Sequence, residues 1–358
     1  MATIIIQEKN VRYSKDMFGI NTSLADPVSP NIPTQFNYEN RASKFGIRRS
    51  HDDRYTTWDR IETSAGVYDW SGLDEWVFRN RGGKLMWTIY QTPTFYATDP
   101  ASIGAYGAGR PGANTPPLDK TKLYNFVAAG LARYRDFGIK IDYLEPFNEV
   151  NMKSFYNGTV ADMAECLRQI RLARDAISPS TKILTPSLTN FDVGSVYTAD
   201  NQNPSTYLPT MLYALDTTGK KLISHCDIFN VHLYGTPALM YDRITLVKNL
   251  ASTYALTQLP LFNSELNYKH NGESEAYMTI QYVRAMFLPV VMGIPTTLYK
   301  FGNAGDTTSG YSMASTPTAF DNLCQVIKDT LTYGIDRVAL ETTSGQITLR
   351  INDVATAY

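Results

Sequence analysis

Eight short apolar runs, separated by loops and longer amphipathic stretches, constrain the fold of this chain more than any other feature. The runs lie at Phe18–Asn21, Phe45–Arg49, Leu85–Tyr90, Ile141–Asn148, Lys182–Leu188, Cys226–Tyr234, Leu259–Glu265 and Thr296–Phe301. They are apolar throughout, which is typical of parallel strands buried on both faces. Apolar residues at helical spacing follow in the stretches between them, notably at Lys120–Phe137, Thr159–Ile177, Ser274–Met292 and Thr318–Tyr333.

Strands that alternate with helices predict an α/β fold with a parallel sheet. Eight such units favour a closed (β/α)8 TIM barrel over an open doubly wound sheet, and no glycine-rich dinucleotide fingerprint follows the first run. The 358 residues suit one barrel with additions, since such barrels take about 250 residues and up to about 400. We therefore predict a single catalytic domain over residues 1–358, with the barrel at about 18–334.

The C-terminal segment predicts a small β decoration on this barrel. Arg337–Ile351 has the pattern of a hairpin that turns at Ser344–Gly345. We expect the hairpin, within residues 336–352, to pair near an N-terminal strand at Thr3–Ile6. The loops Thr98–Pro117, Asn190–Ser205 and Asn303–Ser315 are long and follow strands, so in a barrel they would shape a groove at the C-terminal rim.

The charge balance of the chain argues against two classes of binding partner. The 33 basic and 34 acidic residues nearly cancel, and neither sign forms a run. Nucleic acid would call for a basic face and an anionic membrane for a polybasic patch, so neither is an expected partner. The start, MATIIIQEKN, has no basic n-region and only a short apolar run, so we expect no classical leader in this chain.

No metal, cofactor or redox centre is expected. The four histidines (His51, His225, His232 and His270) lack zinc-ligand spacing, and no serine nucleophile elbow or phosphate loop occurs. Asp52 and Asp53 are adjacent, so in a strand they would point to opposite faces. Cys166, Cys226 and Cys324 are far apart in apolar segments and are interpreted as buried structural thiols.

Two glutamates follow or end apolar runs in the way that a glycosidase requires. Hydrolysis of a glycosidic bond with retention needs two carboxyl groups about 5–5.5 Å apart, one a nucleophile and the other an acid and then a base. Glu149 follows the fourth run and Glu265 ends the seventh. Neither an Asn-Glu dipeptide nor a strand-end glutamate is specific alone, but both positions together predict this chemistry.

The segment Asn148-Glu-Val-Asn151, followed by Phe155-Tyr156 and Gly158, resembles the acid/base motif of clan A glycoside hydrolases, closest to family 39 and its polysaccharide-hydrolase relatives. Similar patterns occur in order at Gly46–Arg49 with Trp58 and Gly66–Trp70, at Gln91–Phe95, and at Cys226–Tyr234. Two positions depart from the family: Val150 replaces a proline, and Tyr299-Lys-Phe301 lacks a tryptophan that many relatives place under the sugar.

The resemblance implies a role for each matched residue. Glu149 would be the acid/base, Glu265 the nucleophile, and Asn148 would hydrogen-bond the sugar 2-hydroxyl. Arg49, with Arg48 as the fallback because the strand register is open by one residue, would lie near Glu265 and keep it ionised. Tyr234 would donate to Glu265, and His232 would line the end of strand six.

Aromatic residues suggest where a sugar chain binds. Phe95, Tyr96, Phe155 and Tyr156 follow rim positions and are candidate platforms for sugar rings, whereas Trp58 and Trp70 are interpreted as core packing. The long rim loops favour a groove, hence endo action on a microbial exopolysaccharide, a capsule or another polysaccharide. Two alternatives stay open: an exo-acting β-xylosidase-type enzyme, or an inactive carbohydrate-binding barrel. Such substrates fit an extracellular, periplasmic or virion-associated protein, with a cytoplasmic location also open.

Overall fold

The structure is a computed structural model of the 358-residue chain. It describes residues 2–7, 12–22, 43–51, 55–189, 191, 197–235, 237–268, 272–301, 317–333, 338–343 and 346–351. Asp52, Asp53, the turn at Ser344–Gly345, the loop Asn303–Ser315 and part of Asn190–Ser205 lie outside the described residues.

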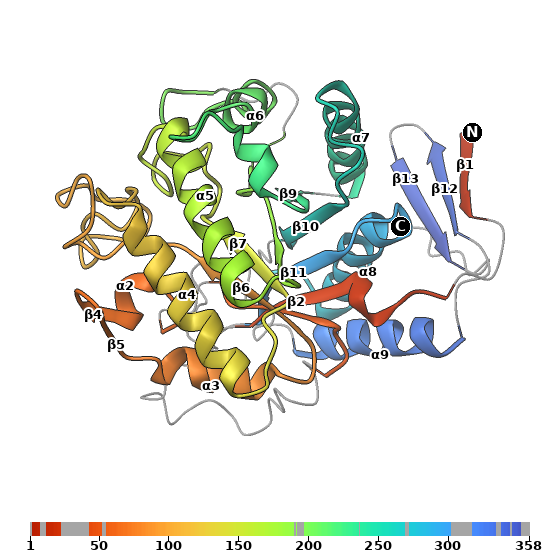
Figure 1. Ribbon diagram of the computed structural model, residues 1–358. Coiled ribbons are helices and arrows are strands. Elements are labelled where there is room, and N and C mark those ends of the chain that lie inside the picture. The colour runs from red at the N-terminus through yellow and green to blue at the C-terminus, as the bar shows by residue number, and fades with distance from the viewer. Residues whose placement is uncertain are drawn as a thin grey trace. The chain divides into compact units, whose positions relative to one another are not determined.

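All eight predicted strands are present. In chain order they are β2 (Phe18–Thr22), β3 (Ile47–Arg49), β6 (Lys84–Ile89), β7 (Tyr143–Pro146), β8 (Lys182–Ile183), β9 (Phe229–His232), β10 (Leu261–Leu266) and β11 (Thr296–Phe301) (Figure 1). Each overlaps the apolar run predicted for it, although β3, β7, β8 and β9 are shorter than their runs because the ends of these runs leave the ladder.

Helices follow the strands from β3 onward. They are α3 (Ser71–Asn80), α4 (Thr121–Asp136), α5 (Val160–Ile177), α6 (Pro204–Leu212), α7 (Pro237–Thr253), α8 (Glu275–Val291) and α9 (Pro317–Tyr333). The short elements are η1 (Lys15–Met17), α2 (Trp58–Ile61), β4 (Glu62–Ser64), β5 (Val67–Tyr68) and η2 (Leu222–His225). The fold class is therefore the predicted (β/α)8 barrel.

Local chemistry sets the ends of the predicted helices. The Thr159 hydroxyl caps α5 by accepting from the Asp162 N–H at 3.0 Å, and the Asp162 carboxylate accepts in return from the Thr159 N–H. Helix α4 ends before Gly138, whose φ of 71° lies in the left-handed region that only glycine adopts without strain. No described helix is both long enough and apolar enough to cross a bilayer.

The chain divides into two compact units, which are described separately. Unit 1 comprises residues 1–48, 233–249 and 262–358, and unit 2 comprises residues 49–232 and 250–261. The expectation that residues 1–358 form a single catalytic domain stays a prediction.

In unit 1, β11 pairs in parallel with both β10 and β2, and α8 packs against α9. The unit also contains the predicted β decoration. Strand β1 (Ala2–Gln7) pairs antiparallel with β12 (Val338–Thr343), which pairs antiparallel with β13 (Gln346–Ile351). The C-terminal hairpin and its pairing with the N-terminal strand are confirmed.

In unit 2, β7 pairs in parallel with β6 on one side and β8 on the other, and a bridge from Leu184 to Ile228 continues the sheet toward β9. The rings of Trp58, Trp70 and Trp87 surround Phe126 of α4, with centroids 5.3–5.7 Å from that ring. Trp58 is a buried core residue, as predicted, whereas Trp70 is half-buried and packs on Phe126 from the edge of this cluster. The three cysteines are buried thiols, and burial raises the pKa of Cys166 and Cys226.

Candidate active site

The backbone after β6 and β7 is strained. Phe147 and Glu149 have φ angles of 58° and 42°, and Gln91, two residues beyond β6, has a φ of 64°. A residue with a Cβ atom rarely adopts this left-handed region, at a cost of about 1–3 kcal/mol, and such residues cluster at functional sites. The strain therefore marks the C-terminal ends of β6 and β7, where Glu149 was predicted to act.

Hydrogen bonds from the segment that follows β8 hold this strained loop. The Glu149 N–H donates to Ser187 Oγ at 3.0 Å, and the Val150 N–H donates to the Ser187 carbonyl at 3.0 Å. The Asn151 side chain accepts from the Thr189 N–H at 3.0 Å and donates to the Thr189 carbonyl at 3.1 Å. The second asparagine of the Asn-Glu-Val-Asn motif thus fixes the loop that presents Glu149.

A buried ion pair lies beside this loop. Arg49 Nε donates to Glu145 Oε2 at 2.6 Å, and both side chains are 0% exposed. Arg49 Nη2 also donates to Asn148 Oδ1 at 3.4 Å. Arg49 therefore orients the Asn148 amide through its oxygen.

Glu145 carries a permanent negative charge at the centre of this cluster. Burial alone would raise its pKa, but the charge and hydrogen bond of Arg49, together with the neighbouring His232, outweigh that effect and hold the pKa well below its usual value of 4.5. Thr88 Oγ1 donates to Oε2 at 2.8 Å, and Asn230 Nδ2 donates to Oε1 at 3.0 Å. Glu145 is thus a fixed charge and not a proton donor.

His232 connects this charge with Glu149. Its Nδ1 lies 3.0 Å from Glu149 Oε1, and its Nε2 lies 3.7 Å from Glu145 Oε1. The ring is buried, and the backbone N–H of His232 donates to the Leu188 carbonyl at 2.9 Å. The structure therefore places four predicted site residues, Arg49, Asn148, Glu149 and His232, in one cluster of unit 2.

The fallback residue Arg48 is placed differently. Its Nη1 donates to the carbonyl of Phe45, and both residues belong to unit 1. Of the two adjacent arginines, Arg49 is the one that contacts Asn148. The expected contact of Arg49 with Glu265 joins residues of different units and stays a prediction.

Glu265 has its own partner in unit 1. The Tyr234 hydroxyl donates to Glu265 Oε1 at 2.5 Å, and Glu265 is 4% exposed. The backbone fixes this pair, because the Leu233 N–H donates to the Glu265 carbonyl at 3.0 Å. The Tyr299 ring, from the strand that lacks the family tryptophan, lies edge-on to Tyr234 at 6.3 Å.

The four rim aromatics differ in what they expose. Phe95 is 50% exposed and lies edge-on to Tyr96 at 4.6 Å, and the Tyr96 hydroxyl donates to Glu62 at 2.9 Å. Phe155 is half-buried and lies edge-on to Tyr106 at 5.8 Å. Tyr156 is 3% exposed, and its hydroxyl donates to the Thr159 carbonyl at 3.2 Å.

Sequence reasoning missed Glu145, Thr88 and Asn230. Glu145 did leave a signal, since it is an acidic residue inside an otherwise apolar strand, where a charge needs a partner. Thr88 and Asn230 left none, because a single small polar residue in a buried strand is common.

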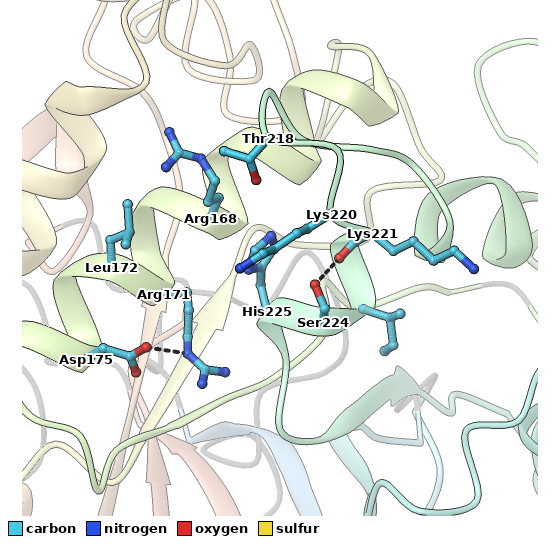
Figure 2. Close-up of a pocket in the computed structure, with 10 residues that line it drawn as sticks. Arg168, Arg171, Leu172, Asp175, Thr218, Lys220, Lys221, Ser224 and His225 are labelled. Atoms are coloured by element: carbon cyan, nitrogen blue, oxygen red, sulfur yellow. Dashed lines mark hydrogen bonds and ion pairs between the residues drawn. The ribbon is translucent and has the colours of Figure 1, made fainter.

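A hollow lined by described residues lies elsewhere in unit 2. It has a volume of about 580 Å³ between α5 and the segment that ends in η2 (Figure 2). Both arginines that line it pair with carboxylates: Arg171 Nε donates to Asp175 at 2.7 Å, and Arg168 Nη2 donates to Glu165 at 2.6 Å. None of the predicted site residues lines this hollow.

No family model and no curated protein matches the sequence. Solved structures of similar fold do match. A glucosidase from Croceicoccus marinus has a TM-score of 0.63 at 14% identity, over 98% of this chain and 77% of that one. A monomeric β-xylosidase from Caulobacter crescentus has a TM-score of 0.62 at 15% identity, over 96% and 73%.

A family 39 glycoside hydrolase from Bacteroides cellulosilyticus has a TM-score of 0.62 at 13% identity, over 94% of this chain and 70% of that one. At such identities the likeness concerns the fold alone. The barrel fold that the resemblance to clan A glycoside hydrolases implied is thereby confirmed, and the similar structures include a family 39 enzyme.

Proposed function

We propose that this chain is a retaining glycoside hydrolase in which Glu149 is the acid/base and Glu265 is the nucleophile. One observation carries the proposal: the end of strand six supplies a partner to each glutamate. His232 Nδ1 lies 3.0 Å from Glu149, and the Tyr234 hydroxyl donates to Glu265 at 2.5 Å. Both glutamates are buried, so each carboxyl group is held in one orientation.

The barrel fold supports joint action of the two glutamates. The C-terminal ends of barrel strands open on one face, where active sites of this fold lie. Glu149 follows strand four, and Glu265 lies near the end of strand seven. We therefore expect their carboxyl groups about 5–5.5 Å apart, as double displacement requires.

In the first step the Glu265 carboxylate attacks the anomeric carbon while Glu149 gives its proton to the departing oxygen. In the second step Glu149 takes a proton from water, which attacks the glycosyl–enzyme and releases Glu265. The hydrogen bond from Tyr234 orients Glu265 for attack. No cofactor takes part in either step.

Asn148 and Arg49 serve substrate binding in this proposal. Because Asn148 Oδ1 accepts from Arg49, its Nδ2 can donate to a sugar 2-hydroxyl, a contact that strengthens in the transition state. Phe95 and Phe155 expose ring surface for sugar stacking. Tyr96 and Tyr156 support the same rim through their hydroxyl hydrogen bonds.

The substrate class is a neutral or weakly charged polysaccharide, such as an exopolysaccharide or a capsule, cleaved internally outside the cell. The nearly balanced charge of the chain and its long rim loops support this class. Exo action remains the second candidate, because the solved structures of similar fold include a glucosidase and a β-xylosidase.

The test is release of reducing ends from a polysaccharide panel by wild type, Glu149→Gln and Glu265→Gln. We expect each variant to lose at least about a thousandfold in rate, about 4 kcal/mol of transition-state stabilisation, with an unchanged circular dichroism spectrum. Glu75→Gln, at an exposed position on α3, is the matched control and should stay fully active. Near-wild-type activity of Glu265→Gln would remove the nucleophile assignment.

Product size separates the modes of action. A ladder of oligosaccharides supports endo cleavage, whereas monosaccharide alone supports the exo-acting alternative. Sugar binding by wild type without cleavage, across a broad panel, would favour the inactive carbohydrate-binding barrel.

A further inference from the structure

The two oxygens of Glu145 have different surroundings. Oε2 accepts from Arg49 Nε at 2.6 Å and from Thr88 Oγ1 at 2.8 Å. Oε1 accepts from Asn230 Nδ2 at 3.0 Å and faces His232 Nε2 at 3.7 Å. The carboxylate is therefore fixed in orientation, with one oxygen committed to the ion pair and the other directed at the histidine ring.

The His232 ring lies between the carboxyl groups of Glu145 and Glu149, which differ in their protonation during the proposed reaction. Glu145 stays an anion, because the neighbouring Arg49 holds its pKa well below the usual value. An acid/base such as Glu149, in contrast, changes its protonation state during each turnover. A neutral imidazole has one N–H and one lone pair, and its surroundings decide which nitrogen carries the proton. An N–H directed at a fixed anion is favoured over a lone pair directed at the same anion.

We propose that Glu145 is a positioning residue that holds His232 as the Nε2–H tautomer, so that Nδ1 presents a lone pair to Glu149. The inference rests on the proposed role of Glu149 as acid/base. At 3.7 Å the Nε2–Glu145 contact is longer than a hydrogen bond, so the carboxylate acts on the ring through its charge. The 3.0 Å contact between Nδ1 and Glu149 Oε1 is then a hydrogen bond that Glu149 donates.

This tautomer would assist both chemical steps. Before cleavage, the Nδ1 lone pair accepts a hydrogen bond from the protonated carboxyl group of Glu149 and holds that group in one orientation. After Glu149 has given its proton to the leaving group, the ring offers no N–H to its carboxylate, which is left to accept a proton from water.

The substitution Glu145→Gln tests this tautomer, because it changes the group that faces His232 Nε2. Arg49 and Thr88 both donate to the Oε2 position, so the amide oxygen of the new glutamine belongs there. Its NH2 group then takes the Oε1 position, where it faces His232 Nε2 as a donor. The Asn230 amide, which donates to that position in wild type, must turn so that its oxygen accepts there. A donor at that position favours a lone pair on Nε2, and the proton should move to Nδ1.

The measurement is nitrogen-15 NMR of protein labelled in its histidine rings, at about pH 7, where a neutral ring gives separate signals for protonated and unprotonated nitrogens. The His232 signals are identified by their loss in His232→Gln. We expect an Nε2–H ring in wild type and an Nδ1–H ring in Glu145→Gln.

His225 is an internal control. Its ring lines the hollow that Figure 2 shows, and its Nε2 lies 2.8 Å from the Asp216 carboxylate. Its signals should match the Nε2–H tautomer in both proteins.

Either an Nδ1–H ring or a doubly protonated ring at position 232 of wild type would overturn the inference. So would an unchanged Nε2–H ring in Glu145→Gln. If that variant does not fold, the wild-type spectrum alone decides. These results do not depend on turnover, so they stay distinct from failure of the proposed function.

A kinetic comparison then tests the consequence. Loss of proton donation should slow Glu145→Gln at least about tenfold on glycosides with poor leaving groups, and much less on dinitrophenyl glycosides, which need no acid. Equal slowing on both would contradict a role in proton transfer.

Discussion

Two arginine–carboxylate pairs of unit 2 have nearly the same length and very different surroundings. Arg49 meets Glu145 at 2.6 Å with both side chains 0% exposed, whereas Arg171 meets Asp175 at 2.7 Å with exposures of 33% and 48%. The second pair lines the large hollow, and the first lies among the motif residues. The hollow among the described residues and the cluster around Glu145 are thus separate features of unit 2. The informative feature is a polar cluster removed from water, because it persists only when every charge has a partner.

The largest expected effect comes from Arg49→Met. Removing one partner of a buried pair leaves the other as an uncompensated charge, which typically costs about 3–5 kcal/mol. Urea unfolding should show a loss of stability in this range. A loss under about 1 kcal/mol would mean that the buried and exposed pairs do not differ as described.

Acid unfolding removes the charge of Glu145 by protonation, without a substitution of its side chain. The folded-state pKa of Glu145 lies below its ordinary value of 4.5, so its stabilisation is complete above that value and is lost as the pH falls toward the folded-state pKa. The free energy of unfolding of wild type should therefore decrease as the pH is lowered below this value. Glu145→Gln should show a shallower decline, and an equal slope in both proteins would contradict the assignment of a depressed pKa.

Thr88→Val removes one donor to Glu145 and should cost about 1.5–3 kcal/mol, since a hydrogen bond to a charged group is lost in the interior. Thr94→Val is the matched control, because its hydroxyl donates to the neutral Pro111 carbonyl at the surface. The control should lose about 0.5–1.5 kcal/mol. Urea unfolding of both variants measures the difference, and equal losses would count against a special role for the cluster.

The smallest effect is expected from Arg171→Ala. Its pair with Asp175 is an i, i+4 pair on α5, exposed to water, and such pairs contribute about 0.2–1 kcal/mol. Both stability and activity should stay close to wild type. An activity loss of more than about tenfold would show that the hollow in Figure 2 takes part in the function.

The repeating pattern of the chain was enough to predict the fold. Apolar runs and helical spacing report burial directly, so the eight strands and the helices α4, α5, α8 and α9 were predicted within a few residues. The cluster around Glu145 was not predicted, because its partners are far apart in sequence: Arg49 and Glu145 are separated by 96 positions and Asn230 and Glu145 by 85. Likewise, the choice between Arg48 and Arg49 depends on which face of β3 points inward, and the sequence left that register open.

The central proposal is that Glu265 is the nucleophile that attacks the sugar and that Glu149 is the acid/base. The most direct test is to trap the glycosyl–enzyme with 2-deoxy-2-fluoroglycosyl fluorides of the xylo and gluco series and to map the adduct by peptide mass spectrometry. We predict an adduct in the peptide that contains Glu265, formed by wild type and absent from Glu265→Gln. An adduct on another carboxylate, or turnover of a substrate whose first product has the inverted anomeric configuration, would contradict the account.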